Sequence, residues 1–119
     1  MSQEVNVQAM SPQEIDERER SFEREGAWRE WIDFTRALAH AQPDPDRARA
    51  TWRRLVKRFE ELAQDAQERD PILSSDLNFF CGQIWLKHLD RDDQAMKAYV
   101  RAYQIDAENI EALQEARAL

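Results

Sequence analysis

The chain has 119 residues, of which 42% are hydrophobic and 34% charged, with two glycines, four prolines and one cysteine. This length fits one domain with a modest core, and a single cysteine excludes an internal disulfide and a cysteine-rich zinc site. The formal net charge of -7 disfavours a general binder of nucleic acid or anionic membranes, because both reward a basic surface.

Strong helix formers dominate the composition, and few segments show the alternation of a β-strand. The sequence therefore predicts an all-α protein. The N-terminus lacks a basic region followed by an apolar stretch, so no signal peptide is visible. No apolar run approaches the roughly 20 residues that span a bilayer. We expect a cytoplasmic protein without membrane insertion.

The first ten residues are polar without a clear period and are predicted to form a disordered tail. Ser11, Pro12 and Glu14 have the spacing of a capping box with proline at the first helical position, so a helix should begin there. This helix is expected to run to Glu25 and to stop at Gly26.

Five further helices are predicted, over residues 27–41, 45–69, 72 or 74 to 89, 92–105, and 109 to the end. Prolines and acidic or amide residues mark most of the boundaries. The fourth helix is apolar on nearly all sides, which is typical of a helix packed between others. The links are short and favour antiparallel neighbours. We expect one helical domain over residues 11–119.

A basic block lies within the third helix. Residues 45–60 contain six bases and two acids, for a net charge of +4. The block is interpreted as a solvated helix face or as a docking patch for an acidic partner, formed by Arg49, Arg53, Arg54 and Lys57. Binding of nucleic acid through the same block is a weaker alternative.

Two tryptophans, Trp28 and Trp31, lie three residues apart on the second helix. They can pack against the neighbouring helices. Alternatively, they form an exposed aromatic patch, used as an interface with a partner or a second copy.

Gly82 lies inside the apolar fourth helix, where glycine costs roughly 1 kcal/mol relative to alanine. The fifth helix carries Ala95, Tyr99 and Ala102 at helical spacing. Small residues let two helix backbones approach closely, and Tyr99 fills the space that remains. Close packing of the two helices is therefore a sufficient reason for the glycine.

This pattern resembles the tetratricopeptide repeat (TPR), a helix–turn–helix unit of about 34 residues. Asn78-x2-Cys81-Gly82-x2-Trp85 and Ala95-x3-Tyr99-x2-Ala102 match its two helices over residues 75–109, and a degenerate repeat lies near residues 12–41. There are three departures: Asn78 replaces the first large aromatic residue of the repeat, the turn between Gly82 and Ala95 is one residue longer than the family spacing, and Ala107 replaces the proline.

The resemblance implies a short TPR-like α-solenoid of about six helices. In that family the first helix of each repeat lines a groove that takes a peptide or a helix. Carried onto this sequence, the residues that face the groove are Asp76, Phe79, Gln83 and Lys87. Phe79 could equally pack against the preceding helix, and the two charged residues could be merely solvated.

Catalysis finds little support in the sequence. His40 and His88 are not at metal-ligand spacing, and two glycines cannot form a glycine-rich phosphate loop. We expect no enzyme, no metal and no cofactor. The leading expectation is a protein–protein interaction adaptor or scaffold that binds a protein partner, such as an acidic peptide or helix. A self-associating assembly domain and a client-binding chaperone are the alternatives. The sequence leaves open whether the chain forms a homo-oligomer.

Overall fold

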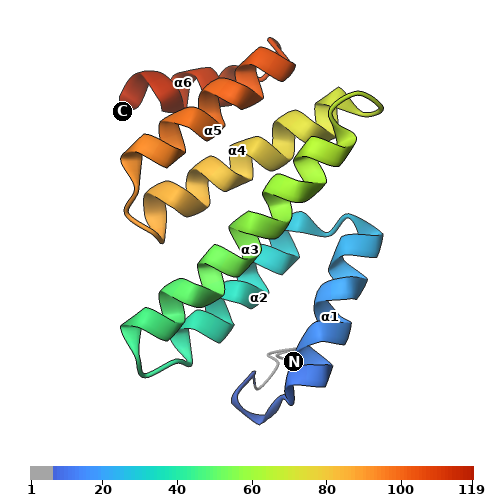
Figure 1. Ribbon diagram of the computed structural model, residues 1–119, viewed down its shortest axis with the longest axis vertical. Coiled ribbons are helices and arrows are strands. Elements are labelled where there is room, and N and C mark those ends of the chain that lie inside the picture. Colours follow the sequence, from blue (N-terminus) through green and yellow to red (C-terminus); the bar gives the residue numbers. More distant parts are fainter. Residues whose placement is uncertain (1–6) are drawn as a thin grey trace, which may run out of the picture. The chain divides into compact units, whose positions relative to one another are not determined.

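The structure is a computed structural model that describes residues 7–119, and all regular elements within this range are helices (Figure 1). They are η1 (Val7–Ala9), α1 (Pro12–Glu25), α2 (Trp28–His40), α3 (Pro45–Ala66), α4 (Pro71–Lys87), α5 (Asp92–Ile105) and α6 (Ile110–Ala118). The predicted all-α class is confirmed.

Two helices end two or three residues earlier than expected, α3 at Ala66 and α4 at Lys87. After α3 the backbone leaves the helical conformation at Asp70, with φ -148° and ψ 75°, and the Asp70 carboxylate caps α4. Of the tail predicted to be disordered, residues 1–6 lie outside the described residues. Val7–Ala9 form η1, which contacts α2.

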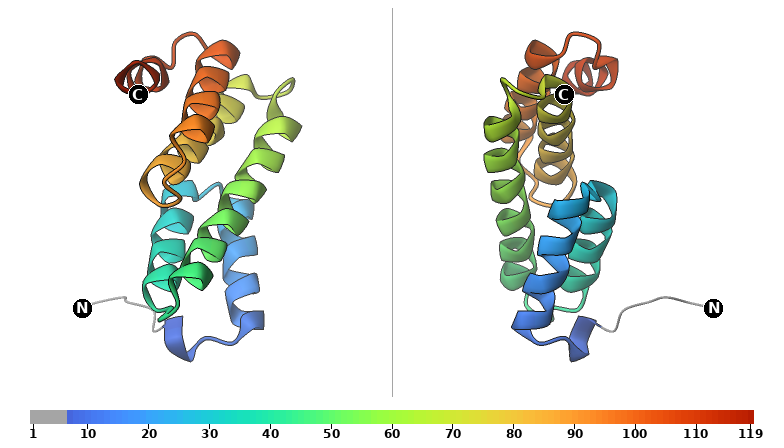
Figure 2. Two further views of the ribbon diagram at one scale, coloured as in Figure 1. Left: turned by 60° about the vertical axis from the view of Figure 1, so that its left-hand side comes forward. Right: turned by 90° about the vertical axis from the view of Figure 1, so that its right-hand side faces the viewer.

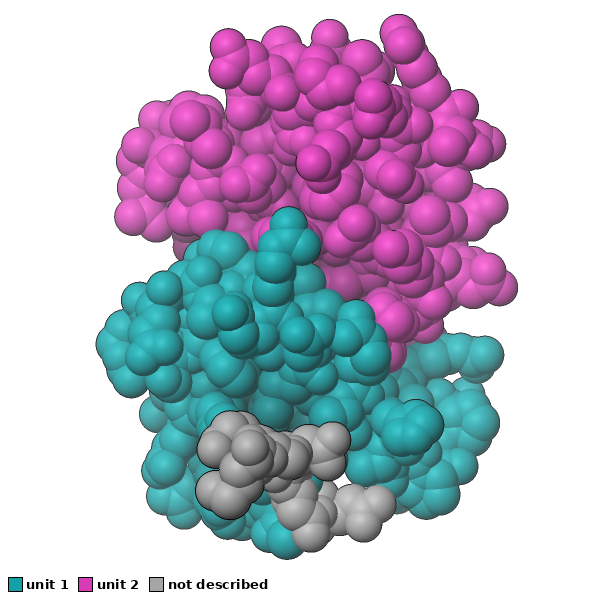
Figure 3. Space-filling view, turned by 180° about the vertical axis from the view of Figure 1, so that it is seen from behind, with its two compact units in different colours: residues 1–51 teal, residues 52–119 magenta. Residues whose placement is uncertain are grey.

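The chain divides into two compact units, residues 1–51 and residues 52–119 (Figure 3). Unit 1 contains η1, α1, α2 and the first turns of α3. Unit 2 contains the rest of α3 together with α4, α5 and α6. The single domain expected over residues 11–119 stays a prediction.

In unit 1, local signals define α1 as the sequence predicts. The Ser11 hydroxyl accepts from the Glu14 N–H, and the Glu14 carboxylate accepts from the Ser11 N–H, both at 3.1 Å. This capping box satisfies two of the N–H groups that a helix start leaves unpaired. Gly26 ends the helix in the left-handed conformation, with φ 67°, which glycine adopts without steric cost.

The packing of α1 on α2 depends on aromatic side chains. The rings of Phe22 and Phe34 lie 5.6 Å apart, and the Arg18 guanidinium lies 6.0 Å from the centre of the Phe34 ring. The Trp31 indole N–H donates to the Glu19 carboxylate at 3.1 Å. None of the residues of α1 is fully buried, and the contact with α2 combines this ring pair with two polar contacts to aromatic side chains.

In unit 2, α3 contributes one apolar face to the core. Asp44 precedes this helix, and its carboxylate accepts from the Asp46 N–H at 3.0 Å, which satisfies one of the N–H groups at the helix start. The buried side chains follow helical spacing: Trp52, Leu55, Val56, Phe59, Ala63 and Ala66. The opposite face is left polar.

The central helix of unit 2 is α4, which buries nine residues. On one side the Ser74 hydroxyl donates to the Ala63 carbonyl of α3 at 2.6 Å. On the other side the Ser75 hydroxyl donates to the Ala102 carbonyl of α5 at 2.7 Å. The prediction that this helix packs between others is confirmed.

The close approach of α4 and α5 explains Gly82. A Cβ atom at this position would lie 2.5 Å from Cε1 and 2.6 Å from Cδ1 of Tyr99, closer than carbon atoms approach without a shift. Tyr99, Ala95 and Ala102 are fully buried. The two helices run antiparallel side by side in every view (Figures 1 and 2), and the predicted reason for the glycine is confirmed.

The last helix, α6, packs on α5 (Figure 2). Its buried residues are Ala112 and Ala116. Asn109 caps α6, since its carboxamide oxygen accepts from the Ala112 N–H at 3.2 Å. The Asn109 amide also donates to the Ser75 hydroxyl at 2.8 Å, so α6 is tied to α4 as well.

We expect Gly82→Ala to destabilise the fold by about 1–3 kcal/mol, because overpacking against the buried Tyr99 ring outweighs the roughly 1 kcal/mol gain in helix propensity. Chemical denaturation measures this difference. The matched control is the same substitution in a Tyr99→Leu background, where the ring is gone and the loss should shrink or reverse. An equal loss in both backgrounds would contradict the contact as the cause.

A second prediction concerns alkaline pH. Burial, reinforced by the negative charge of Glu115, raises the pKa of Tyr99 to about 12. In the unfolded chain the pKa of tyrosine is about 10. The contribution of the neutral Tyr99 phenol to stability is therefore fully present below about pH 10, and it is lost as the pH rises through the folded pKa of about 12. We expect the free energy of unfolding to fall by about 3 kcal/mol across this window.

The control for this prediction is Tyr99→Phe, which removes the titrating group. The Tyr99 hydroxyl has no hydrogen-bond partner among residues 7–119, so its loss should cost little at neutral pH. Denaturation curves at stepwise alkaline pH compare the two proteins. The same alkaline loss in Tyr99→Phe would assign the effect to another group.

Candidate functional site

The polar face of α3 forms one wall of a pocket in unit 2. Glu60, Gln64 and Gln67 follow one another at intervals of four and three residues, which places them on one side of the helix. The two glutamines are exposed and Glu60 is half-buried. Ala63 lies between them and is buried. This wall therefore presents one carboxylate, two amides and one small apolar side chain.

Asn78 of α4 forms the floor of the pocket. Its side chain is only 4% exposed, although α4 is otherwise mostly apolar. The Asn78 amide donates to the Ser74 carbonyl at 2.9 Å, and its oxygen accepts from Nε of Arg101 at 3.1 Å. A buried amide needs such partners, because leaving it unpaired costs about 1–3 kcal/mol.

Arg101 of α5 forms the opposite wall. Its Nε is bonded to Asn78, which fixes the guanidinium plane against α4. For this side chain the structure records no ion pair with any of the described residues. The two Nη groups, which carry four of the five N–H donors of the guanidinium, are therefore not engaged by a carboxylate of the described chain.

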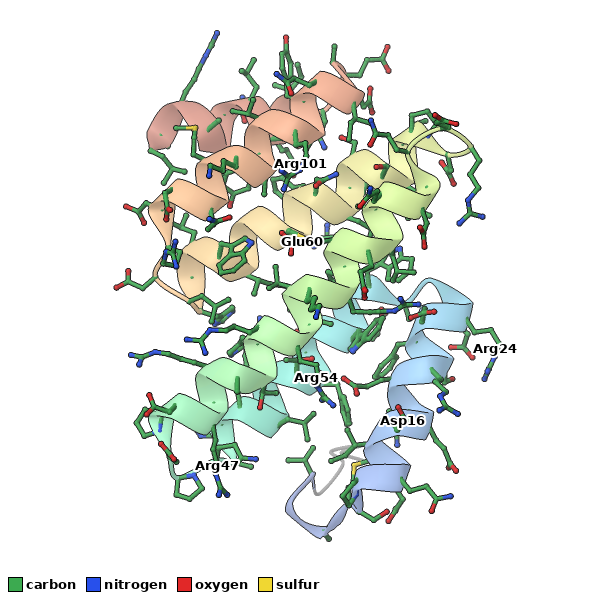
Figure 4. The ribbon with its side chains drawn as sticks, in the orientation of Figure 1. Asp16, Arg24, Arg47, Arg54, Glu60 and Arg101 are labelled. Atoms are coloured by element: carbon green, nitrogen blue, oxygen red, sulfur yellow. The ribbon has the colours of Figure 1, made fainter. Side chains whose placement is uncertain are left out.

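These residues enclose a pocket of about 390 Å³, lined by Glu60, Ala63, Gln64, Gln67, Asn78 and Arg101. Figure 4 labels Glu60 on α3 and Arg101 on α5, with α4 running between them. The lining comes from three consecutive helices of one unit. Such a volume lies at the lower end of the range for ligand sites.

The electrostatics of the pocket are mixed, because a carboxylate and a guanidinium line it together. Both act on Cys81, which is buried on α4. Burial raises the pKa of the Cys81 thiol well above its ordinary value; Glu60 adds to the rise and Arg101 opposes it. The thiol therefore stays protonated at neutral pH, which does not suit a nucleophile. Cys81 is therefore a small buried side chain of the core.

The groove residues expected from the repeat resemblance do not line this pocket. Asp76 and Lys87 are exposed and Gln83 is half-buried. Phe79 is buried, with its ring 6.1 Å from that of Phe80 and 5.7 Å from that of Tyr99. Phe79 is therefore part of the core, and little of its surface is available to a partner.

The four residues of the basic patch on α3, Arg49, Arg53, Arg54 and Lys57, are all exposed. Arg49 lies 3.6 Å from the carboxylate of Asp46, an exposed pair of small energetic value. Arg53 and Lys57 precede Glu60 at intervals of four and three residues. They therefore extend the same side of α3 that lines the pocket.

The two candidate interface tryptophans have different environments. Trp31 is 4% exposed and is fixed by its hydrogen bond to Glu19. Trp28 is half-buried, with its ring stacked on that of Trp31 at 6.4 Å. Trp31 thus packs within unit 1, and Trp28 alone keeps part of its ring at the surface.

Neither a metal-binding cluster nor a membrane-spanning helix is present among the described residues. Within residues 7–119, no group of three or more histidine, cysteine, aspartate or glutamate side chains could hold a metal ion. In the same range no helix combines the length and the hydropathy needed to cross a membrane.

The comparisons with known proteins were also negative. No protein-family model, no curated protein and no solved structure matched the chain. The repeat resemblance therefore rests on the residues themselves and stays a prediction.

The sequence analysis missed the pocket residues, but one signal was present. Asn78 replaces the first large aromatic residue of the repeat pattern, and an amide inside an apolar helix requires a polar partner. Nothing in the sequence identifies that partner as Arg101, which lies 23 residues away.

Proposed function

We propose that this chain is a non-catalytic protein-interaction module, an adaptor or scaffold, and that unit 2 is a short TPR-like helical array. The arrangement of unit 2 supports the second part. Helices α4 and α5 form a closely packed antiparallel hairpin, and α6 packs on α5 as the first helix of a further unit would. Stacked helical hairpins commonly serve as extended binding surfaces.

The observation that carries the proposal is the polar pocket over α3, α4 and α5. Three of its six lining residues are amides: Gln64, Gln67 and Asn78. A side-chain amide both donates and accepts hydrogen bonds, as a peptide group does. The exposed pair, Gln64 and Gln67, can therefore bond to the backbone of a bound segment whatever its side chains are.

The test is a pull-down from nuclease-treated lysate of the native host with wild-type protein and Gln64→Ala/Gln67→Ala. Both glutamines are exposed, so the fold should persist. The matched control is Gln104→Ala/Gln114→Ala, two exposed glutamines that do not line the pocket. We expect a protein that is retained by wild type and by the control but is lost from the pocket variant.

Retention of the same proteins by all three baits would remove the pocket from the proposal. Recovery of no protein other than the bait would contradict the interaction module itself.

A second candidate function, self-association, is favoured by exposed apolar side chains on α5 and α6. Val100 is 38% exposed, Ile110 51% and Leu119 43%. Large apolar side chains at the surface are candidate contact residues for an interface. Sedimentation velocity over a wide range of concentrations tests this candidate with wild type and Ile110→Glu. Self-association through α6 requires a dimer or larger species in wild type that Ile110→Glu weakens by about tenfold or more.

A further inference from the structure

We propose that the pocket recognises an internal aspartate or glutamate side chain of an extended peptide, and that Arg101 binds its carboxylate. This inference rests on the proposed function and names the chemistry of its ligand. It is carried by the way in which α4 holds the arginine.

Arg101 is positioned before any ligand arrives. An arginine on a helix surface ordinarily samples many rotamers, and ordering it costs binding free energy. Here Nε donates to the buried Asn78 oxygen at 3.1 Å, and Asn78 is itself held by the Ser74 carbonyl at 2.9 Å. With Nε engaged, the end of the guanidinium with its two Nη groups is left to meet a ligand. That end matches the two oxygens of a carboxylate.

Glu60 explains why the ligand should be a carboxylate and not a phosphate. It lines the same pocket as Arg101, and the structure records no ion pair between them within residues 7–119. A phosphate carries close to two negative charges at neutral pH and would be repelled more strongly than a singly charged carboxylate. Glu60 can instead accept a hydrogen bond from a backbone N–H of the bound segment.

The surroundings of the pocket favour an acidic segment. Arg53 and Lys57 lie on the same side of α3, about two turns and one turn before Glu60 respectively, and both are exposed. Although the chain carries a net charge of -7, this side of α3 is basic up to the edge of the pocket. Further acidic residues of the ligand would therefore meet positive charge along α3.

The experiment begins with a displayed library of random linear peptides whose ends are blocked, so that no terminal carboxylate is offered. The library is selected on wild-type protein. A selected peptide is then labelled and measured by fluorescence anisotropy in three forms: with its aspartate or glutamate, with the neutral amide in that place, and with phosphoserine in that place.

The protein variants are Arg101→Gln, which removes the charge, and Arg101→Lys, which keeps the charge but loses the fork. Arg117→Gln is the matched control, an exposed arginine of α6 outside the pocket lining. Circular dichroism verifies that each variant is folded. We expect wild type to select peptides with an acidic residue, and the amide form to bind about tenfold or more weakly, as loss of a charged hydrogen-bonded pair requires.

Arg101→Gln and Arg101→Lys should each bind the acidic peptide about tenfold or more weakly than wild type does, and Arg117→Gln should bind it as tightly as wild type. Selected peptides that lack an acidic residue, or that bind wild type and Arg101→Gln equally, would overturn the role of Arg101 while supporting the interaction module. Tighter binding of the phosphoserine form would overturn the choice of a carboxylate. The absence of any selected peptide would overturn the inference and count against the proposed function as well.

Discussion

The close contact of Gly82 with Tyr99 is the constraint on which the rest of unit 2 depends. It sets how near α5 lies to α4, and hence which polar groups can bridge the two helices. One turn before Gly82 on α4 lies Asn78, and two residues after Tyr99 on α5 lies Arg101; these two side chains meet at 3.1 Å. Extra bulk at position 82 would separate the helices and lengthen that hydrogen bond. The glycine is therefore a condition of the pocket geometry as well as of core packing.

The pocket also shows how one helix can belong to a core and to a surface. α4 is buried on nearly every side, yet its Asn78 side chain lines the pocket and binds Arg101. This is achieved because the amide does not itself reach the surface but orients an arginine that does. The buried, rigid helix α4 thus fixes the orientation of a long side chain on the neighbouring helix α5.

The elements of this fold could be predicted from the sequence because the signals that define them are local. Ser11 and Glu14, Gly26, and Asp70 before Pro71 act within a few residues of themselves, and the structure places helix boundaries at each. The burial of Gly82 against Tyr99 was also predictable, since a glycine inside an apolar helix demands a close neighbour.

The candidate site was much harder to predict because it depends on register between helices. The meeting of Asn78 with Arg101 follows from how α5 lies along α4, which no local pattern specifies. The repeat resemblance placed Phe79 in a groove, whereas its ring packs against Phe80 and Tyr99. Similarly, the spacing of Trp28 and Trp31 does not reveal that Glu19 of α1 fixes one of the two indoles.

The Ser75 hydroxyl couples local unfolding of α6 to the hairpin formed by α4 and α5. Ser75 donates to the Ala102 carbonyl of α5 and accepts from the Asn109 amide at the start of α6, and it is fully buried. The first turn of α6 is thus coupled to α4 and α5, because its departure would remove the Asn109 donor from the Ser75 hydroxyl at the open end of the hairpin. Through this one atom, three helices share a hydrogen-bonded junction, so the loosening of the terminal helix is coupled to the integrity of the two before it.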